Sequence, residues 1–561
     1  MQAHLRASFG AITCALLTAA VLTGGAATAS VGPRGHARTW WVQSGAPADG
    51  TGSASRPFDS LAEVQAASGP GDRILIVPAA AAAGPLDGGI ALQHDQQLLG
   101  LGGPVTGLPV GSPAPDIANT TAQDNGDAIT LASGSSVHNI AVTAAVRGGI
   151  YGDNVSDVSV TGNDISGTNT SCQPGFLIYF PVSLSPTGLR NGWAAIMLDE
   201  SHGSSTAVIS GNYVHHAACA DGIDIRTSGT ARSAVTINGN DVSRLQQGPA
   251  VGSVLALGFQ ALDSARLTAS ANANSETSIG SAGADCEGLF TNQTGSSLID
   301  LTIKKNTFAY GIGGASCNGL EAFVGRDAAT DDVVMKDSTF TDDPGDMIEE
   351  NNLGTGSTMN LNLDHVTVSD TTISKPEVTT PDPAFGQLTG HGDCINQFTT
   401  GPQATSSLTV SDSSISNCGN DGIFAFANTP PAAAAASAAI TVNHTSISAA
   451  KNYGLHWVNY GAIGWVRIDM SHDLFVNNTT ADAAFDAATG ATTQHAAINL
   501  GTSVRTGCNS FLSIPLALET TGYPVTAQYN WWGQPVPSPA QIAAAGGGGV
   551  ATDPPLNSPA C

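Results

Sequence analysis

A short phrase recurs along most of this chain and constrains its fold more than any other feature. The phrase is a small residue followed by Ile, Leu or Met, and it returns about every 27 to 32 residues where the spacing is tightest. A period in that range indicates an array of stacked supersecondary units. Clear copies are Gly149-Ile150-Tyr151, Gly222-Ile223-Asp224, Gly319-Leu320-Glu321 and Gly454-Leu455-His456.

The residues of each repeat predict strands. Apolar and polar residues alternate over four to eight positions, as in the run from Val235 to Val242, and Gly, Asn, Asp and Ser fill the intervals as tight turns require. Two or three short strands per repeat predict one coil of a parallel β-helix, with each strand about 4.8 Å from its copy in the next coil. A β-propeller would need roughly 40 residues per blade, so the period favours the β-helix.

The first 29 residues have the pattern of a signal peptide. Arg6 precedes an apolar run over 9–22, and Ala27-Thr28-Ala29 provides a small-x-small cleavage site. No later stretch of the sequence is apolar enough for a membrane span. We therefore expect a secreted protein, extracellular or periplasmic, with no membrane contact after the signal is removed.

The cysteines support export. Of nine, Cys14 belongs to the predicted signal, and the even number that remains favours disulfides over a metal or redox site. Proximity in the sequence suggests these pairs: Cys172 with Cys219, Cys286 with Cys317, Cys394 with Cys418, and Cys508 with Cys561.

The net charge of −26 excludes some partners. A chain this acidic repels nucleic acid and anionic membranes, and it disfavours polyanionic glycans unless a cation intervenes. Because each coil buries its apolar residues against its neighbours, we expect one elongated domain and a monomer. The predicted division is a signal peptide over 1–29, an N-terminal cap and first coils over 30–115, β-helix repeats over 116–510, and a closing segment over 511–561.

Both ends of the mature chain resemble those of bacterial β-helix proteins of the pectin-lyase-like superfamily. The N-terminal resemblance rests on Asp49-Gly50-Thr51, Pro57-Phe58 and the segment 70–77, which contains Gly71-Asp72 and the strand Ile74 to Val77. The C-terminal one rests on the segment 528–533, with its two tryptophans. The resemblance implies a right-handed helix with a capped N-terminus.

A weaker resemblance links the chain to polygalacturonase-type glycosidases. The segment Ala220 to Ile225 is similar to one of their motifs, and Gly392-Asp393-Cys394-Ile395 is similar to another. The chain departs from that class because Cys394 stands where a second aspartate is expected, and Asp469 stands where a lysine is expected.

Alternation predicts which side chains face outward. If Ile223 and its equivalents face the core, the residues one and three positions later face solvent. Two insertions, over 168–191 and 374–390, would then wall a cleft across this row. Aromatic and polar side chains of the row are predicted to contact sugar rings: Tyr151, Arg226, Phe290, Phe323, Asn396, Phe424 and His456.

Carboxylates of the same row predict hydrolytic chemistry. Glycoside cleavage uses two carboxyl groups about 5 to 9.5 Å apart, and coil stacking supplies such distances. A turn-forming role is the alternative for Asp221, as for Asp393 and Asp421. The candidate catalytic residues are Asp221, Asp224, Glu287, Glu321 and Glu350, and Glu349 is a further candidate beside Glu350.

The first functional hypothesis is a polysaccharide-degrading glycosidase that needs no cofactor. The second is a calcium-assisted polysaccharide lyase, since lyases of the same superfamily pair calcium-binding aspartates with a basic residue, and Arg226 and Arg326 lie near candidate carboxylates. The third is a non-catalytic glycan-binding module. The fold alone does not choose among them.

Overall fold

The computed structural model describes most of the chain. The described residues are 37–559 except 81–82, 103–113, 181–187, 249–251, 282–285, 310, 315–316, 375–391, 429–434, 489–490, 492 and 494. The predicted signal peptide, residues 1–29, lies outside them.

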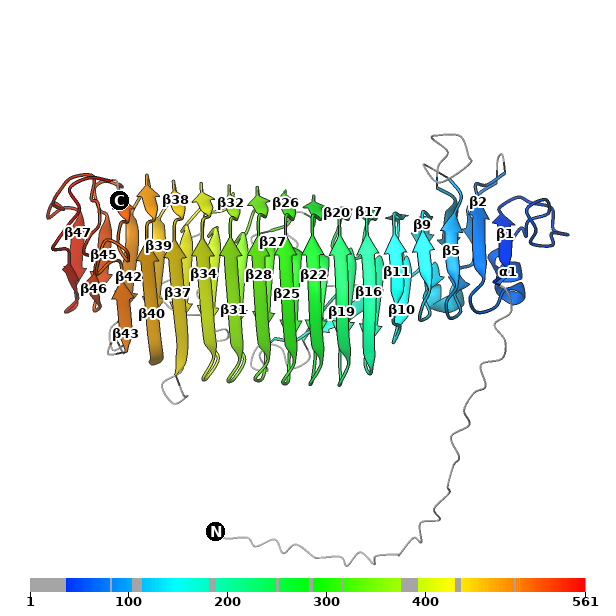
Figure 1. Cartoon of the computed structure of the whole chain (residues 1–561), viewed down its shortest axis with the longest axis horizontal. Helices are drawn as coiled ribbons and strands as arrows, with labels where there is room; N and C mark the ends of the chain where they lie inside the picture. The colour runs from blue at the N-terminus through cyan, green and yellow to red at the C-terminus, as the bar shows by residue number, and fades with distance from the viewer. Residues whose placement is uncertain are drawn as a thin grey trace, which may run out of the picture. The chain divides into compact units, whose positions relative to one another are not determined.

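Three long parallel sheets form the walls of a coil (Figure 1). Sheet I has 17 strands, among them β16 (Ser204–Ser210), β19 (Arg232–Asn238), β28 (Thr330–Lys336), β31 (Thr358–Asp364), β34 (Thr405–Ser411), β37 (Ala436–Asn443) and β40 (Ile463–Ser471). Sheet III has 14 strands, among them β12 (Asp164–Ser166), β17 (Tyr213–Ala217), β20 (Asp241–Leu245), β26 (Thr307–Ala309) and β29 (Thr339–Thr341).

Sheet II contains the recurring Gly-Ile phrase. Its 15 strands are β4 (Ile90–Ala91), β7 (Ile129–Thr130), β10 (Ile150–Asp153), β15 (Ile196–Glu200), β18 (Ile223–Thr227), β21 (Val254–Ala261), β24 (Cys286–Gln293), β27 (Cys317–Val324), β30 (Ile348–Asn352), β33 (Ile395–Thr399), β36 (Ile423–Ala427), β39 (Tyr453–Asn459), β42 (Ala481–Ala487), β45 (Leu518–Thr521) and β47 (Ile542–Ala545).

Each sheet II strand pairs in register with its copies in the neighbouring coils. Ile223 pairs with Ile196 on one side and with Leu257 on the other, and Leu257 pairs with Leu289. All four side chains belong to one apolar core that fills the lumen. The predicted fold, an all-β right-handed parallel β-helix, is confirmed.

Asparagines explain why the phrase Gly-Asn-Asp recurs between strands. The backbone N–H of Asn212 donates to Asn240 Oδ1 at 3.0 Å, and that of Asn240 donates to Asn274 Oδ1 at 3.0 Å. These side chains are buried, so each coil satisfies buried polar groups of the next. A row of identical amides is therefore a stacking signal in the sequence.

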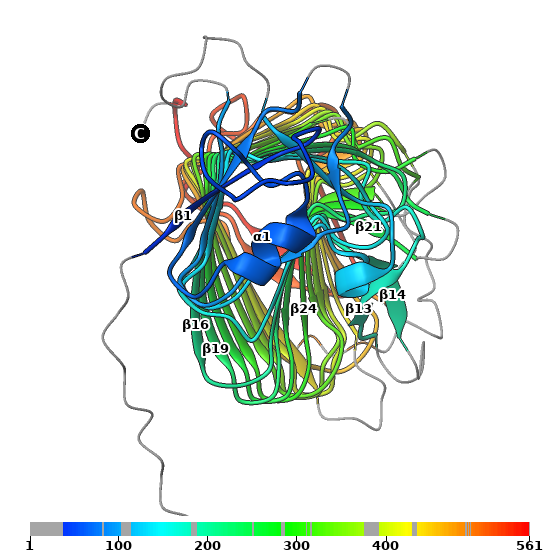
Figure 2. The same ribbon diagram turned by 90° about the vertical axis from the view of Figure 1, so that its right-hand side faces the viewer.

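The two ends of the coil are closed. Helix α1 (Leu61–Ala67) lies across the N-terminal opening (Figure 2) and buries Leu61 and Val64 in the core. Near the other end Trp532 is buried and stacks on Phe511, with ring centroids 5.0 Å apart. Both covers keep water from the apolar lumen. No helix of the described residues is long and apolar enough to cross a membrane.

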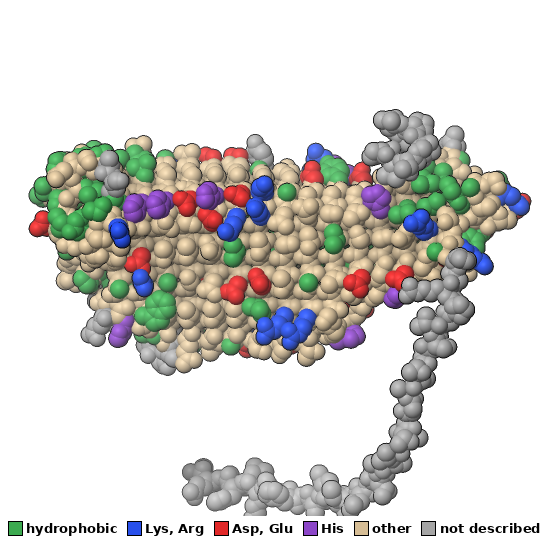
Figure 3. Space-filling model, viewed as in Figure 1, with side chains coloured by type: hydrophobic (Ala, Val, Ile, Leu, Met, Phe, Trp, Pro, Cys, Tyr) green, Lys and Arg blue, Asp and Glu red, His purple; other side chains and the backbone are tan. Residues whose placement is uncertain are grey.

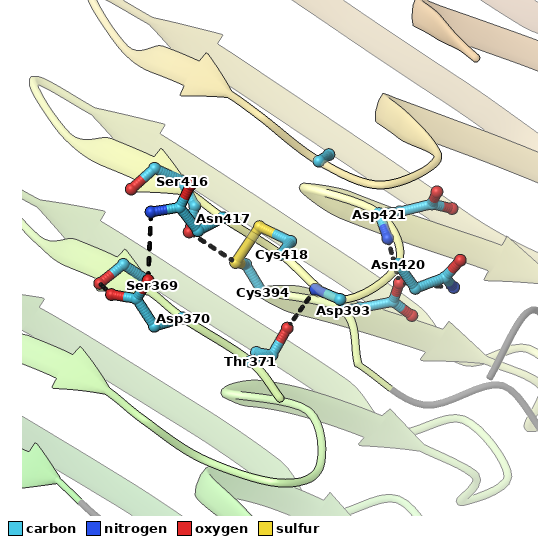
Figure 4. The surroundings of a disulfide bond; sticks show 12 residues. Ser369, Asp370, Thr371, Asp393, Cys394, Ser416, Asn417, Cys418, Asn420 and Asp421 are labelled. Carbon is cyan, nitrogen blue, oxygen red and sulfur yellow. Dashed lines mark hydrogen bonds between the residues drawn. A yellow bond between two sulfur atoms is a disulfide. The ribbon is translucent and has the colours of Figure 1, made fainter. Parts of the chain in front are cut away.

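Disulfides join neighbouring coils as the sequence predicts. Cys172–Cys219, Cys286–Cys317 and Cys394–Cys418 are formed. Figure 4 shows the third of these bonds beside the turn of β33. Cys508 is also disulfide-bonded, and its predicted partner Cys561 lies outside the described residues.

An antiparallel hairpin interrupts the repeat between β12 and β15. Its strands are β13 (Pro174–Ile178) and β14 (Leu189–Gly192). They lie outside the coil beside the wall that holds β21 and β24 (Figure 2). This hairpin is the first of the two predicted insertions.

Candidate active site

The β13–β14 hairpin lies on the outer face of sheet II. Gln260 Nε2 donates to Leu177 O at 2.7 Å, and the backbone N–H of Tyr179 donates to Asn292 Oδ1 at 3.0 Å. Arg326 also donates to the carbonyl of Phe180. Strand β13 and the two residues that follow it therefore cover part of this face between β21 and the end of β27, instead of standing beside it as a cleft wall.

This cover corrects the prediction that the aromatic side chains of the row face solvent. Phe290 and Phe323 do point to the outer face, but they are buried with Phe176 and Ile178 of the hairpin in a second apolar cluster. Tyr151 packs against the same cluster. Aromatic side chains on the outside of this sheet are thus explained by what covers them.

Two further members of the predicted row are buried nearer the C-terminus. Phe424 belongs to a third apolar cluster with Phe398 and Phe426, and Asn396 is also buried. The expectation that these side chains are open to solvent is therefore wrong. The second predicted insertion, over 374–390, lies outside the described residues except for Ser374.

Asp221 and Asp224 form a buried carboxyl pair beneath the hairpin. Asn191 of β14 donates to Asp224 Oδ2 at 3.1 Å, and the N–H of Leu255 donates to Asp221 Oδ1 at 3.2 Å. Burial, and after it the charge of Asp224, raises the pKa of Asp221 well above its usual value; burial also raises the pKa of Asp224. In this closed arrangement the pair has no solvent-exposed surface.

Arg226 does not have the character of a catalytic base. Its guanidinium pairs with Asp199, with Nε donating at 2.7 Å to Asp199 Oδ1. Although burial opposes its charge, the hydrogen bond to Asp199 raises the pKa of Arg226 above its ordinary value. The base role that a lyase would require therefore receives no support from this side chain.

Glu350 faces the lumen, which corrects its prediction as an outward residue. The recurring phrase also returns as Asp346-Met347-Ile348, which predicts Met347 at the core position of this coil. Ile348 instead pairs with Leu320 and with Ile395 and so occupies that position. Glu350 is therefore an inward residue, and Gln397 Nε2 donates to its Oε2 at 2.9 Å. Burial raises the pKa of Glu350 to about 8.

Other polar side chains share the lumen with Glu350. Thr291 Oγ1 donates to Asp331 Oδ2 at 2.5 Å, and burial raises the pKa of Asp331 to about 7. The charge of Asp331 also raises the pKa of Glu350. These carboxyls are stabilised in their protonated form by the core of the coil and have no solvent access for catalysis.

Glu349 takes the outward position and lies beside Glu321. The two residues are register partners on β30 and β27. Both side chains are half-buried, in contrast to the buried positions around them. Neighbouring strands are about 4.8 Å apart, so the two carboxyl groups extend from adjacent positions on one face.

Amides hold this pair crosswise. Asn351 of β30 donates to Glu321 Oε1 on β27 at 2.9 Å, and Asn318 of β27 donates to Glu349 Oε2 on β30 at 2.7 Å. Asn318 and Asn351 are both buried. A carboxylate that accepts from a buried amide on the next strand is held in one orientation, as a catalytic group must be.

Glu287 lies one coil before Asn318 and is buried. Its Oε2 accepts a hydrogen bond from Ser253 Oγ at 2.5 Å. The position is at the start of the strand, two residues before the core Leu289. Glu287 therefore borders the Glu321–Glu349 pair without sharing its half-exposed row.

Aspartates at the strand starts have a turn-forming role. Asp393 Oδ1 accepts from the N–H of Asp421 at 2.8 Å, and Asp421 Oδ1 accepts from the N–H of Tyr453 at 2.9 Å. Figure 4 shows Asp393 with Asn420 and Asp421 at the turn of the next coil. Asp221 accepts from Leu255 in the same way. Each of these aspartates thus accepts a hydrogen bond from a backbone N–H of the next coil and stabilises the stacking of the two coils.

His456 lies between two carboxylates farther along the same face. Its ring nitrogens are 3.2 Å from Asp421 Oδ2 and 3.2 Å from Asp486 Oδ2. Although burial opposes the charge, these hydrogen bonds raise the pKa of His456 to about 10. A protonated His456 therefore neutralises part of an acidic row and is half-buried there.

The sequence pattern names Glu321 as a catalytic candidate and Glu349 as a further candidate beside Glu350. It places Asn318 at an outward strand entry without a role, and it misses Asn351. The register of the coils decides between Glu349 and Glu350, because Ile348 continues the core column of Leu320 and Ile395 and so turns Glu349 outward. The amides carry no such signal, since Asn is also common in turns.

Comparisons with known proteins found distant structural matches only. No family model matches the chain, and no curated protein matches it. Similar solved structures include the catalytic unit of a GH87 α-1,3-glucanase from Streptomyces thermodiastaticus, with 11% identity, 95% of this chain and 72% of that chain covered, and a TM-score of 0.36. The periplasmic alginate epimerase AlgG is also similar, with 10% identity, 86% of this chain and 78% of that chain covered, and a TM-score of 0.28. The pectate lyase Pel9A has 12% identity, with 82% of this chain and 79% of that chain covered, and a TM-score of 0.25.

Proposed function

We propose that this protein is a secreted carbohydrate-active enzyme, a glycosidase that cleaves a polysaccharide between the carboxyl groups of Glu321 and Glu349. The observation that carries the proposal is the crosswise pair itself: two half-buried carboxyls on adjacent strands, each held by an amide of the other strand.

The chemistry follows from the spacing. One carboxyl group protonates the leaving glycosidic oxygen, and the other attacks the anomeric carbon. Carboxyl groups about 5 Å apart leave no room for a water between them and the sugar, so the spacing of neighbouring strands favours a retaining mechanism. In the second half-reaction, the first carboxyl takes a proton from the water that hydrolyses the glycosyl-enzyme bond.

The charge of the chain narrows the substrate class. The net charge is −26, and the half-buried Asp486 adds a further carboxylate to the same face. Such a surface favours a neutral polysaccharide over a polyuronate. The disulfides support a location in an oxidising, extracytoplasmic compartment, in agreement with the predicted signal peptide.

The test is product release from a panel of neutral and acidic polysaccharides, comparing the wild-type chain with Glu321→Gln and Glu349→Gln. We expect new reducing ends from a neutral polysaccharide, and their loss in both variants. The matched control is Glu350→Gln, which changes the next residue of the same strand but on its lumen face.

Two outcomes would overturn the proposal. Unsaturated products that depend on calcium would identify a lyase. Retention of a glycan on an affinity gel without any cleavage, unchanged by both substitutions, would identify a binding module.

A further inference from the structure

We propose that Asp346 is a positioning residue for the Glu321–Glu349 pair, because it holds the amide of Asn318, which in turn holds Glu349. Asp346 lies just before strand β30, one coil after Asn318. The role rests on the proposed glycosidase function, and it adds to that function a residue that acts on the reaction through Asn318.

Asp346 belongs to a row of buried side chains at the starts of sheet II strands. We call this row the entry ladder, and its members are Asn318, Asp346, Asp393 and Asp421. The Oδ1 of each member accepts a backbone N–H of the next coil. Tyr453 donates to Asp421 at 2.9 Å, and Asp421 donates to Asp393 at 2.8 Å. Asp393 donates to Asp346 at 2.8 Å, and Asp346 donates to Asn318 at 3.2 Å. The ladder therefore continues from β39 to β27.

Asn318 differs from the other members of the entry ladder because it is an amide. Its Oδ1 accepts the N–H of Asp346, and its Nδ2 donates to Glu349 Oε2 at 2.7 Å. Only the oxygen end of an amide can accept a backbone N–H, so the bond from Asp346 fixes which end faces Glu349. An aspartate at position 318 could accept the same N–H, but it would have no donor for Glu349. The amide thus stands where the ladder meets the carboxyl pair.

The carboxylate of Asp346 fixes the backbone that presents this N–H. Its Oδ1 accepts the N–H groups of Gly392 and Asp393, each at 2.8 Å, and so ties the start of β30 to the start of β33. Gly392 has a φ of 102°, and any side chain there would collide with the carbonyl oxygen of Ile373. Asp346 is therefore held between the Asn318 amide and a turn that has little room to move.

Burial separates the entry ladder from other carboxylates of the chain. Figure 3 shows acidic side chains on the outer surface of the coil, several of them beside histidine or basic side chains. Water solvates such exposed groups, so changing them has small effects. Asp346 is buried and depends on its N–H donors. Its loss must therefore leave those buried N–H groups to find other partners, and the backbone around them has to shift.

The simpler explanation is that Asp346 only forms a turn, as Asp393 and Asp421 do. That explanation accounts for the bonds from Asp346 to the following coil. It does not account for the bond in the other direction, to an amide whose second end reaches Glu349. The two explanations differ in what Asp346 does to the reaction. Asp393 is the matched comparison, because it makes the same kind of turn one coil farther from the amide.

The experiment compares cleavage by Asp346→Ala, Asp346→Asn, Asp393→Ala and Glu349→Gln in the full chain. Asp346→Ala should lower kcat about tenfold and change KM less than about twofold, because the orientation of Glu349 is lost and substrate binding is not. Asp346→Asn keeps an oxygen for the two N–H groups and should retain about half of the wild-type kcat or more. Asp393→Ala should lower the melting temperature as much as Asp346→Ala does, yet keep kcat within about twofold of the wild type.

Crystal structures of the two alanine variants test the geometry without any substrate. In Asp346→Ala we expect Asn318 Nδ2 to leave hydrogen-bond distance of Glu349 Oε2, whereas Asp393→Ala should keep that bond near 2.7 Å. Asp346→Ser is the milder substitution if Asp346→Ala does not fold, and the same direction of change in kcat is expected. An Asn318–Glu349 bond that persists unchanged in the variants of Asp346 would overturn the role.

Failure of this role and failure of the proposed function give different results. If Glu349→Gln abolishes cleavage while Asp346→Ala keeps the wild-type kcat, the role of Asp346 is wrong and the proposed function stands. Equal losses of kcat in Asp346→Ala and Asp393→Ala would likewise reduce Asp346 to a turn former. If Glu349→Gln cleaves as the wild type does, the proposed function is wrong, and the role of Asp346 in it is overturned as well.

Discussion

Glu349 and Glu350 are consecutive residues of one strand, yet they belong to different environments. Glu349 faces outward, half-buried, and accepts a hydrogen bond from Asn318 beside a second carboxyl. Glu350 faces the lumen, is fully buried, and has a pKa raised to about 8 by that burial. The comparison shows that the chemistry of a carboxyl group in a β-helix depends on whether its side chain faces the lumen or the outside. A register shift of one residue moves a side chain from one face of the sheet to the other.

The outer face itself is divided into two regions. Over β21, β24 and the end of β27 at Phe323 the hairpin covers it and makes a second apolar cluster with Phe290 and Phe323. At the Glu321–Glu349 pair the side chains are half-exposed. The hairpin thus leaves partial solvent access where two carboxyls adjoin, and we place the proposed site there.

The largest expected effect is a difference in polysaccharide cleavage between variants of the two neighbouring glutamates. Glu349→Gln should reduce polysaccharide cleavage about 1000-fold or more, because the proposed reaction loses one of its two carboxyl groups. Glu350→Gln should change cleavage less than about threefold at pH 6, where Glu350 is already protonated. Initial rates of reducing-end release measure the activity of both variants. Equal losses of activity in the two variants would contradict the assignment of Glu349 as catalytic and Glu350 as non-catalytic.

The next effect is on stability, and it compares an aromatic side chain on the covered outer face with one in the lumen. Phe323→Ala should lower the free energy of unfolding by about 3–5 kcal/mol, as much as Phe340→Ala does in the core, since both side chains are buried among apolar neighbours. Denaturant titration of both variants is the measurement. A loss below about 1 kcal/mol for Phe323→Ala would mean that the hairpin does not hold its place on the sheet.

The third effect uses pH. The pKa of Glu350 is about 8 and that of Asp331 about 7 in the folded chain, both above their values of 4.5 and 3.8 in an unfolded one. The folded state therefore binds more protons than the unfolded state between about pH 4 and 8, and stability must fall as the pH rises through that window, by about 4 kcal/mol for each carboxyl group and so by roughly 8 kcal/mol for the two.

Glu350→Gln tests that assignment. The variant should match wild type near pH 5 and exceed its unfolding free energy at pH 8, because no proton is then lost from this side chain. Urea midpoints across the pH range give the comparison. An unchanged pH profile in Glu350→Gln would show that Glu350 does not titrate in the lumen.

The smallest effect concerns orientation. Asn351→Ala removes the amide that donates to Glu321 and should lower kcat about 10- to 100-fold while changing KM little. Asn360→Ala is the control, because Asn360 also donates to a carboxylate, Asp332, but on the exposed face of sheet I. A large rise in KM with kcat unchanged would make Asn351 a substrate-binding residue instead.

The sequence predicts the fold well because each coil repeats the same sequence features. The Gly-Ile period, the alternation of apolar and polar residues and the buried asparagines all recur from coil to coil. A copy that departs from the pattern therefore does not change the predicted fold, because the other copies still indicate it. The three disulfides formed in the structure follow instead from the proximity of their cysteines in the sequence, and Cys286 and Cys317 also occupy the same strand position one coil apart.

The candidate site is predicted less completely, and the reasons are local. Asp346-Met347-Ile348 offers two apolar residues in succession, so alternation alone cannot decide which one faces the core, and choosing Met347 turns Glu350 outward. The path of the hairpin is not part of the repeat, so nothing in the sequence pattern predicts that it covers Phe290. Buried polar residues such as Asp331 interrupt an apolar column and are visible only once the register is known.

The hairpin has one more consequence, for the way the coil opens. In a solenoid each coil contacts only its neighbours, so opening can begin anywhere and spread one coil at a time. Here Tyr179 reaches Asn292 across 113 residues, and the carbonyl of Phe180 reaches Arg326 across 146. The hairpin therefore ties together coils that are not sequential neighbours. Backbone amides from β15 to β27 should exchange their hydrogens with a common protection, as one cooperative unit within a chain whose other coils fray individually.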